Sequence, residues 1–137
     1  MKGSDLLVQS LVQAGVKYVF GMSGHSTSAV LDSISREPSI RFILAKHENT
    51  SVSMADGIAR VTQQPVVCVS HSGPSAANMI TGIASAFKDS APMVVITCNE
   101  EQSRMPRDVL NTWDQLTPFQ SITKWSVRPS SPGKCRG

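Results

Sequence analysis

Residues 66–97 read VVCVSHSGPSAANMITGIASAFKDSAPMVVIT, and this stretch contains two apolar runs joined by a segment with helical periodicity. VVCVS (66–70) and MVVIT (93–97) are almost continuously apolar, which is typical of strands that are buried on both faces of a sheet. Between them, apolar residues recur at helical spacing, and we expect them to face the core: Ile80, Ile83, Ala84 and Phe87. A strand, a helix and a second strand in this order predict a parallel pair with a helical crossover.

The segments before this unit repeat the same alternation. Strands are predicted over YVFGM (18–22) and RFILA (41–45), and SITKWSV (121–127) is a candidate for a final strand. Three helices are predicted: one from a Ser4 cap to Gly15 with Leu7, Leu11 and Val12 on one face, one with Val30, Leu31 and Ile34 facing inward, and one from KHEN through about Arg60. The whole pattern predicts an α/β fold, a three-layer sandwich with a mostly parallel sheet and helices on both faces.

Composition narrows the class of protein. The chain has 137 residues, of which 40% are hydrophobic, and this suits a single globular domain. Its formal charge of +3 comes from scattered Lys and Arg, which argues against nucleic acid as a partner. Cys68, Cys98 and Cys135 form no CxxC pair, so neither a zinc site nor a disulfide framework is indicated. No signal peptide or membrane-spanning run is apparent, and a cytoplasmic location is expected.

Polar clusters follow each of the four predicted strands. They are SGHS (23–26), His47-Glu48, His71-Ser72-Gly73-Pro74 and Asn99-Glu100-Glu101. In parallel sheets ligands bind beyond the carboxyl ends of the strands, so these clusters predict one site at one edge. We also expect the strand that precedes His71 to lie next to the strand that precedes Glu48.

The chemistry of these clusters leaves alternatives open. Glu48 opens a helix, so burial would raise its pKa and the helix dipole would lower it, but it could equally be a capping carboxylate. His71 could serve the site or simply bond its own loop, and His47 is expected to be structural or partly exposed. The loop SHSGPSAAN (70–78) lacks the spacing of a P-loop, and Ser72 does not lie in the G-x-S-x-G elbow of hydrolases.

Three segments together carry a family resemblance: GVKYVFGMSGHS (15–26), KHENTSVSMADGIAR (46–60) and PVVCVSHSGPSAANMITGIASAFKDSAPMVVIT (65–97). Their order and spacing resemble the pyrimidine-binding domain of the thiamine-diphosphate superfamily that includes acetolactate synthase, benzoylformate decarboxylase and pyruvate decarboxylase. Benzoylformate decarboxylase is especially similar, because it also has a histidine at the position of His71. The resemblance implies a pyrimidine-binding domain over residues 1–128, with 129–137 an irregular tail or the start of a missing segment.

The resemblance implies a role for each matching residue. Glu48 matches the catalytic glutamate that hydrogen-bonds N1′ of the cofactor aminopyrimidine and favours its 4′-imino tautomer. The other cofactor-binding matches are Gly21, Gly24, Pro74 and Asn78, although Ser23 stands where the family usually has proline. His71 matches a catalytic residue poised for proton transfer. His25 matches a substrate-side position, with loop support as the competing role.

The resemblance also implies what this chain lacks. The family holds the diphosphate and Mg²⁺ on a separate domain with a G-D-G motif, and no G-D-G occurs here. The implied enzyme is a 2-keto acid decarboxylase or acetolactate-synthase-like carboligase, inactive as the isolated chain. Its expected partners are a diphosphate-binding domain or subunit and further copies of itself, with no metal bound by this chain. The alternative is a catalytically silent domain with an assembly or regulatory role, which the retention of Glu48 and His71 disfavours.

Overall fold

A computed structural model describes residues 2–99 and 113–129 of the chain. The elements follow in the order α1 (Gly3–Gln13), β1 (Tyr18–Gly21), the short 3₁₀ helix η1 (His25–Thr27), α2 (Ser28–Ser35), β2 (Arg41–Leu44), α3 (Glu48–Thr62), β3 (Val66–Ser70), α4 (Pro74–Ala77), α5 (Ile80–Lys88), β4 (Met93–Thr97) and α6 (Thr117–Gln120). Strands and helices thus alternate through most of the described chain, as the sequence predicts.

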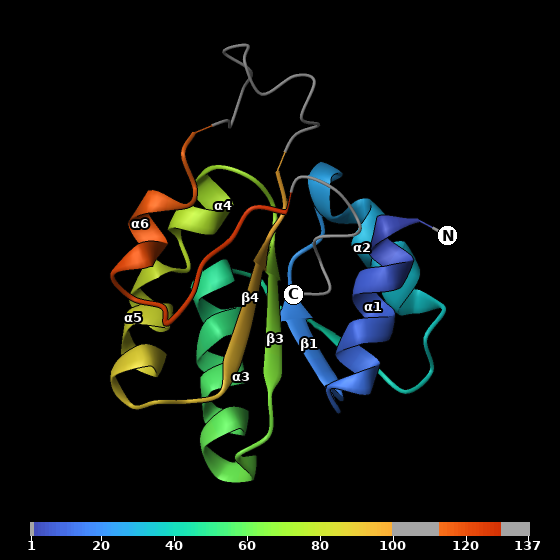
Figure 1. Ribbon diagram of the computed structural model, residues 1–137, viewed down its shortest axis with the longest axis horizontal. Coiled ribbons are helices and arrows are strands. Elements are labelled where there is room, and N and C mark those ends of the chain that lie inside the picture. The colour runs from blue at the N-terminus through green and yellow to red at the C-terminus, as the bar shows by residue number, and fades with distance from the viewer. Residues whose placement is uncertain (1, 100–112, 130–137) are drawn as a thin grey trace.

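The four strands form one parallel sheet in the order β2-β1-β3-β4. Helices α1 and α2 cover one face of this sheet, and α3 and α5 cover the other (Figure 1). Strand β3 is buried along its whole length, which explains its unbroken apolar run. The predicted three-layer α/β fold is therefore confirmed, and the sheet formed by the described residues is entirely parallel.

Side chains of β3 alternate between two cores, one on each face of the sheet. Val67 and Val69 pack with residues of α1 and α2, whereas Val66 and Cys68 pack on the side of α3 and α5. Helix α3 presents alanines to β1 and β3, and small side chains allow a helix to approach a sheet closely. None of the helices in the described part of the chain combines the length and apolar character needed to cross a membrane.

Two local predictions are wrong. Helix α1 starts at Gly3 with Lys2 as its N-cap residue, and the Asp5 carboxylate, rather than a Ser4 cap, accepts the Lys2 N–H at 3.1 Å. Phe87 is exposed rather than in the core. Ile83 and Ala86 take the buried side of α5, and the turn of about 100° per residue carries Phe87 to the edge of that stripe.

The candidate final strand at SITKWSV is also wrong. Residues 121–127 contain no strand, because local hydrogen bonds fold them against the end of α6. Ile122 N–H donates to the Phe119 carbonyl at 3.1 Å, and the Thr123 hydroxyl donates to the same carbonyl at 2.7 Å. Such side-chain bonds to nearby backbone compete with strand pairing. The predicted tail from 130 onward, Cys135, Glu100 and Glu101 lie outside the described residues.

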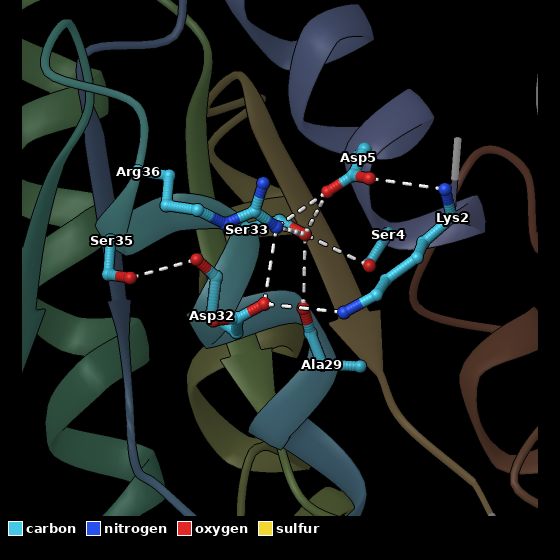
Figure 2. Close-up of polar contacts among 8 residues, drawn as sticks. All are labelled: Lys2, Ser4, Asp5, Ala29, Asp32, Ser33, Ser35 and Arg36. Atoms are coloured by element: carbon cyan, nitrogen blue, oxygen red, sulfur yellow. Dashed lines mark hydrogen bonds and ion pairs between the residues drawn. The ribbon is translucent and has the colours of Figure 1, made fainter.

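A polar cluster joins α1 to α2 (Figure 2). The Asp5 carboxylate accepts from the Arg36 guanidinium at 2.7 Å and from the Ser33 hydroxyl at 2.8 Å. These bonds, the Arg36 bond first, lower the pKa of Asp5 from 3.8 to about 2. Arg36 also pairs with Asp32 at 3.2 Å, but the Asp32 side chain is 53% exposed against 23% for Asp5. Asp5 is therefore the better-shielded anion of the cluster.

The end of β1 approaches the backbone of β3 closely at Gly21. A Cβ atom placed on Gly21 would lie 2.4 Å from the Val69 carbonyl oxygen of β3. A carbonyl in a paired strand cannot move aside as a flexible side chain can. Gly57, in the middle of α3, contrasts with this position, because a Cβ there would meet nothing within 4 Å.

We expect the two glycines to respond in opposite directions to alanine. Gly21→Ala should lower the free energy of unfolding by about 1–3 kcal/mol or more, because the added methyl group overpacks the β1–β3 contact. Gly57→Ala should raise it by about 0.5–1 kcal/mol, because alanine favours an exposed helix interior. Urea denaturation of both variants measures the difference, and a neutral Gly21→Ala would contradict this packing.

Asp5 should make the fold sensitive to acid. A carboxyl whose pKa is lower in the folded chain stabilises it above the unfolded pKa, here 3.8, and this contribution disappears as the pH falls toward about 2. Asp5→Asn should therefore be destabilising at pH 6, with a difference from the unmodified chain that shrinks between about pH 5 and pH 2. Denaturation curves across this range give the measurement. Asp32→Asn is the control and should change the profile less, since exposed ion pairs contribute little.

Candidate functional site

The carboxyl ends of the strands meet at one edge of the sheet, which points toward the top of Figure 1, where α4 lies. The turn with η1 follows β1, Glu48 follows β2, and the loop at His71 follows β3. The predicted gathering of these segments is thus present. The expected adjacency of the strands before Glu48 and His71 is wrong, because β1 pairs with both β2 and β3 and separates them.

Glu48 is the first residue of α3, but it is not the cap of that helix. His47 is the N-cap residue, and its Nδ1 atom accepts the Asn49 N–H at 3.2 Å. The capping alternative for Glu48 is therefore only partly right: His47 is the capping residue, in the structural role expected for it, although the Glu48 carboxyl also bonds a backbone N–H at the helix start. The Glu48 carboxylate has a further partner on another segment. Its Oε2 atom accepts a hydrogen bond from Asn78 Nδ2 at 3.0 Å.

Opposing effects set the pKa of Glu48. Partial burial raises the pKa, but the hydroxyl of Ser75, the amide of Asn78, the backbone N–H at the helix start and the nearby His47 together outweigh it, and the net pKa is lowered. The Ser75 hydroxyl lies close enough to act in this way although it is buried and completes no well-aligned hydrogen bond among the described residues. Glu48 is therefore a carboxylate at neutral pH, and a carboxylate only accepts hydrogen bonds.

A tight turn places Asn78 beside Glu48. Gly73 has φ of +66°, a conformation that L side chains rarely adopt, and Pro74 follows it as the first residue of α4. Four residues later the chain reaches Asn78, which is 30 positions from Glu48 in sequence. Pro74 is exposed on this turn and makes no hydrogen bond to Glu48. The turn at Gly73 places it at the edge.

His71 is held by the turn after β1. Its Nδ1 atom accepts the Ser26 N–H at 3.3 Å and also bonds the Ser26 hydroxyl, which in turn accepts the Ser72 N–H at 3.2 Å. Gly24 lies against the imidazole, since a Cβ there would lie 2.9 Å from His71 Cγ. The alternative that His71 bonds its own loop is therefore wrong: its imidazole bonds the turn after β1, the strand that pairs with β3.

Two of the remaining predicted site residues, His25 and Gly21, make no polar side-chain contact with Glu48 or His71. His25 is exposed, and its imidazole has no hydrogen bond or ion pair among residues 2–99 and 113–129. Gly21 lies inside the sheet, against Val69, and faces no open space. Sequence reasoning missed Ser26 and Ser75, whose only signal was a hydroxyl within a glycine-containing turn.

Neither a reactive thiol nor a cluster of metal ligands is present among the described residues. Burial raises the pKa of the Cys68 thiol to about 12 and that of Cys98 to about 11, so both are inert thiols at neutral pH. No group of three His, Cys, Asp or Glu side chains suited to a metal ion occurs in the described part of the chain.

A groove of about 520 Å³ lies elsewhere, between α5, β4 and residues 115–127. Neither Glu48 nor His71 lines it. Glu48 and His71 therefore lie at the carboxyl edge of the sheet, outside the groove that α5, β4 and residues 115–127 line.

Comparison with known proteins identifies related sequences. The family model for "Thiamine pyrophosphate enzyme, N-terminal TPP binding domain" matches residues 1–117. The chain is 35% identical over 132 residues to a probable acetolactate synthase large subunit of Methanocaldococcus jannaschii, covering 96% of this chain and 22% of that protein. It is 37% identical over 124 residues to the chloroplastic acetolactate synthase of Arabidopsis thaliana, covering 90% and 18%. It is 36% identical over 126 residues to the large subunit of acetolactate synthase isozyme 3 of Escherichia coli, covering 92% and 22%. The chain thus spans about a fifth of the length of these relatives.

Removing the Asn78 amide should raise the pKa of Glu48. Asn78→Leu eliminates a donor that stabilises the charged form, while partial burial of Glu48 remains. Titration of the Glu48 side-chain carboxyl by carbon-13 NMR gives the pKa in both chains. Gln63→Leu is a control, because that amide donates to the Arg60 carbonyl at the far end of α3, away from Glu48. An unchanged Glu48 pKa in Asn78→Leu would show that the Glu48–Asn78 bond is unimportant in solution.

Proposed function

This chain belongs to the thiamine pyrophosphate enzyme family, as its N-terminal TPP binding domain, and we propose that it forms the pyrimidine-binding half of an active site for 2-keto acids. The observation that carries the proposal is the Glu48 carboxylate. It lies partly buried at the carboxyl edge, His47 caps the helix that it opens, and its pKa is lowered. The names of the relatives favour an acetolactate-synthase-like carboligase over a simple decarboxylase.

The residues around Glu48 fit an aminopyrimidine ring. Such a ring presents nitrogen donors and acceptors along its edge, and the chain offers a carboxylate acceptor next to a buried Ser75 hydroxyl with no completed bond. When bound, thiamine diphosphate supplies a carbon nucleophile and an electron sink. Glu48 would accept a hydrogen bond from N1′–H and thereby favour the imino form of the ring, while Asn78 keeps the carboxylate oriented. Partial burial strengthens such a bond, because the local dielectric is low.

The other predicted site residues would support the cofactor ring or face the substrate. Pro74 and Asn78 would border the pyrimidine from the turn before α5. Gly21 and Gly24 would act by close packing, since Gly21 brings β1 against β3 and Gly24 admits the His71 ring. His71 would lie on the substrate side as a proton-transfer group, with the exposed His25 on the same side, where the 2-keto acid would enter.

A second domain would complete the site. Glu48 is at the carboxyl edge, the described residues offer no cluster of metal ligands, and the relatives are about five times longer than this chain. We therefore infer that Mg²⁺ and the diphosphate are held by a diphosphate-binding domain or subunit, and that the isolated chain is inactive. Assembly as a homo-oligomer and a cytoplasmic location belong to the same proposal.

Glu48→Gln in the assembled enzyme should slow exchange of the thiazolium C2 proton by several powers of ten, each worth about 1.4 kcal/mol of barrier. Glutamine keeps the size of the side chain but replaces the charged acceptor. Proton exchange followed by NMR is the measurement. Glu37→Gln is the control, because Glu37 is a carboxylate with a lowered pKa that lies between α2 and β2, at the amino end of the strand. Near-normal exchange in Glu48→Gln would show that Glu48 does not activate the cofactor.

A further inference from the structure

We propose that Ser26 is a positioning residue that holds neutral His71 in the Nε2–H tautomer, so that His71 meets a substrate as a hydrogen-bond donor. The inference rests on the proposed function only for the identity of the substrate, a 2-keto acid. The tautomer itself follows from contacts within this chain.

The backbone N–H of Ser26 determines which ring nitrogen of His71 carries the proton. An N–H group can only donate, and the Ser26 N–H is directed at His71 Nδ1 at 3.3 Å. Nδ1 must therefore offer its lone pair. A proton on Nδ1 would place two donors head to head. A neutral imidazole carries one ring proton, so that proton resides on Nε2.

The Ser26 hydroxyl reinforces the same assignment. It accepts the Ser72 N–H at 3.2 Å and contacts His71 Nδ1 with its own oxygen. Because the Ser72 bond uses an acceptor site of Oγ, the hydroxyl proton is free to point at Nδ1. Backbone N–H of Ser72, hydroxyl of Ser26 and Nδ1 of His71 then form a chain of bonds with one direction, and such chains strengthen each member.

The turn that carries Ser26 is itself fixed. Thr27 is fully buried, and its hydroxyl accepts the Gly24 N–H at 2.8 Å and donates to the Gly24 carbonyl at 2.9 Å. Gly24 in turn packs against the imidazole, where a Cβ would approach Cγ to 2.9 Å. The position of Ser26 relative to His71 is thus set by packing as well as by hydrogen bonds, over a sequence separation of 45 residues.

The tautomer has a chemical consequence. Neutral His71 presents an N–H at Nε2, which can donate to a carbonyl or carboxylate oxygen, and these are the polar groups of a 2-keto acid. To take up a proton, it must use Nδ1, which breaks the bond from the Ser26 N–H and turns the Ser26 hydroxyl from donor to acceptor. Neutral His71 is therefore arranged to donate a hydrogen bond through Nε2, and it can transfer a proton only after Nδ1 has taken one up.

The test reads the tautomer directly in the unmodified chain. Two-bond proton–nitrogen correlation spectra of the ¹⁵N-labelled chain, about two pH units above the ordinary histidine pKa of about 6.5, separate the two tautomers. His71→Gln identifies the His71 signals. We expect a single Nε2–H form for His71. His47, whose Nδ1 also accepts a backbone N–H, should match it, and the exposed His25 should show the mixture of an unconstrained imidazole.

Three variants then test Ser26. Ser26→Ala removes the hydroxyl contact but keeps the backbone N–H, so the Nε2–H form should remain the major one while the ratio shifts about fivefold toward that of His25, the effect of losing one ordinary hydrogen bond. Ser26→Thr keeps the hydroxyl and should restore the ratio. Ser28→Ala is the control, because the Ser28 hydroxyl is in the same turn but donates to the His25 carbonyl at 2.7 Å. It should leave His71 unchanged.

Two outcomes would overturn the inference: an Nδ1–H form or a His25-like mixture for His71 in the unmodified chain, or a tautomer ratio in Ser26→Ala equal to that of the unmodified chain. The first measurement needs no variant, so it stands even if Ser26→Ala fails to fold. None of these spectra requires cofactor or turnover. Failure of the proposed function would instead appear as normal proton exchange in Glu48→Gln with the His71 tautomer intact.

Discussion

The close approach of β1 to β3 is the constraint on which the site depends. Gly21 brings the end of β1 against the Val69 carbonyl, and β1 also pairs with β2 on its other side. The turn after β1 therefore leaves the sheet directly beside the loop after β3. Ser26 reaches His71, and Gly24 reaches its ring, because the strands that carry them are in contact. A wider strand separation would remove all three contacts at once.

Helix capping provides the second condition. The first turn of α3 needs an acceptor for its free N–H groups, and an acidic residue at that place would ordinarily serve. Here the His47 imidazole supplies the acceptor, and Glu48 is turned toward Asn78 on a different segment. The helix start still lowers the pKa of the carboxyl. The helix start thus helps to keep Glu48 charged, while Oε2 of its carboxylate still accepts the bond from Asn78.

The sequence predicted the layers, the parallel strands and the edge where the polar clusters meet, because apolar runs and helical spacing are local signals. It did not predict the strand order, and so it placed His71 one strand too close to Glu48. It also missed Ser26, whose partner is 45 positions away. The final strand expected at 121–127 failed because Thr123 and Ile122 bond back to Phe119, which periodicity cannot reveal. Contacts between distant segments decided each of these outcomes.

The two halves of the edge have opposite hydrogen-bonding character. On one side of β1, a carboxylate with a lowered pKa can only accept. On the other side, the Ser26 contacts occupy Nδ1 of His71, so the proposed tautomer would leave Nε2–H as a donor. Each group is oriented by a residue from another segment, Asn78 for Glu48 and Ser26 for His71, so neither has to reorganise when a ligand arrives. Preorganised groups of this kind lower the cost of binding and of charge development. In the proposed function, the acceptor would meet a ring nitrogen and the donor would meet a keto acid oxygen, and β1, which lies between the strands that precede them, would keep the two groups apart.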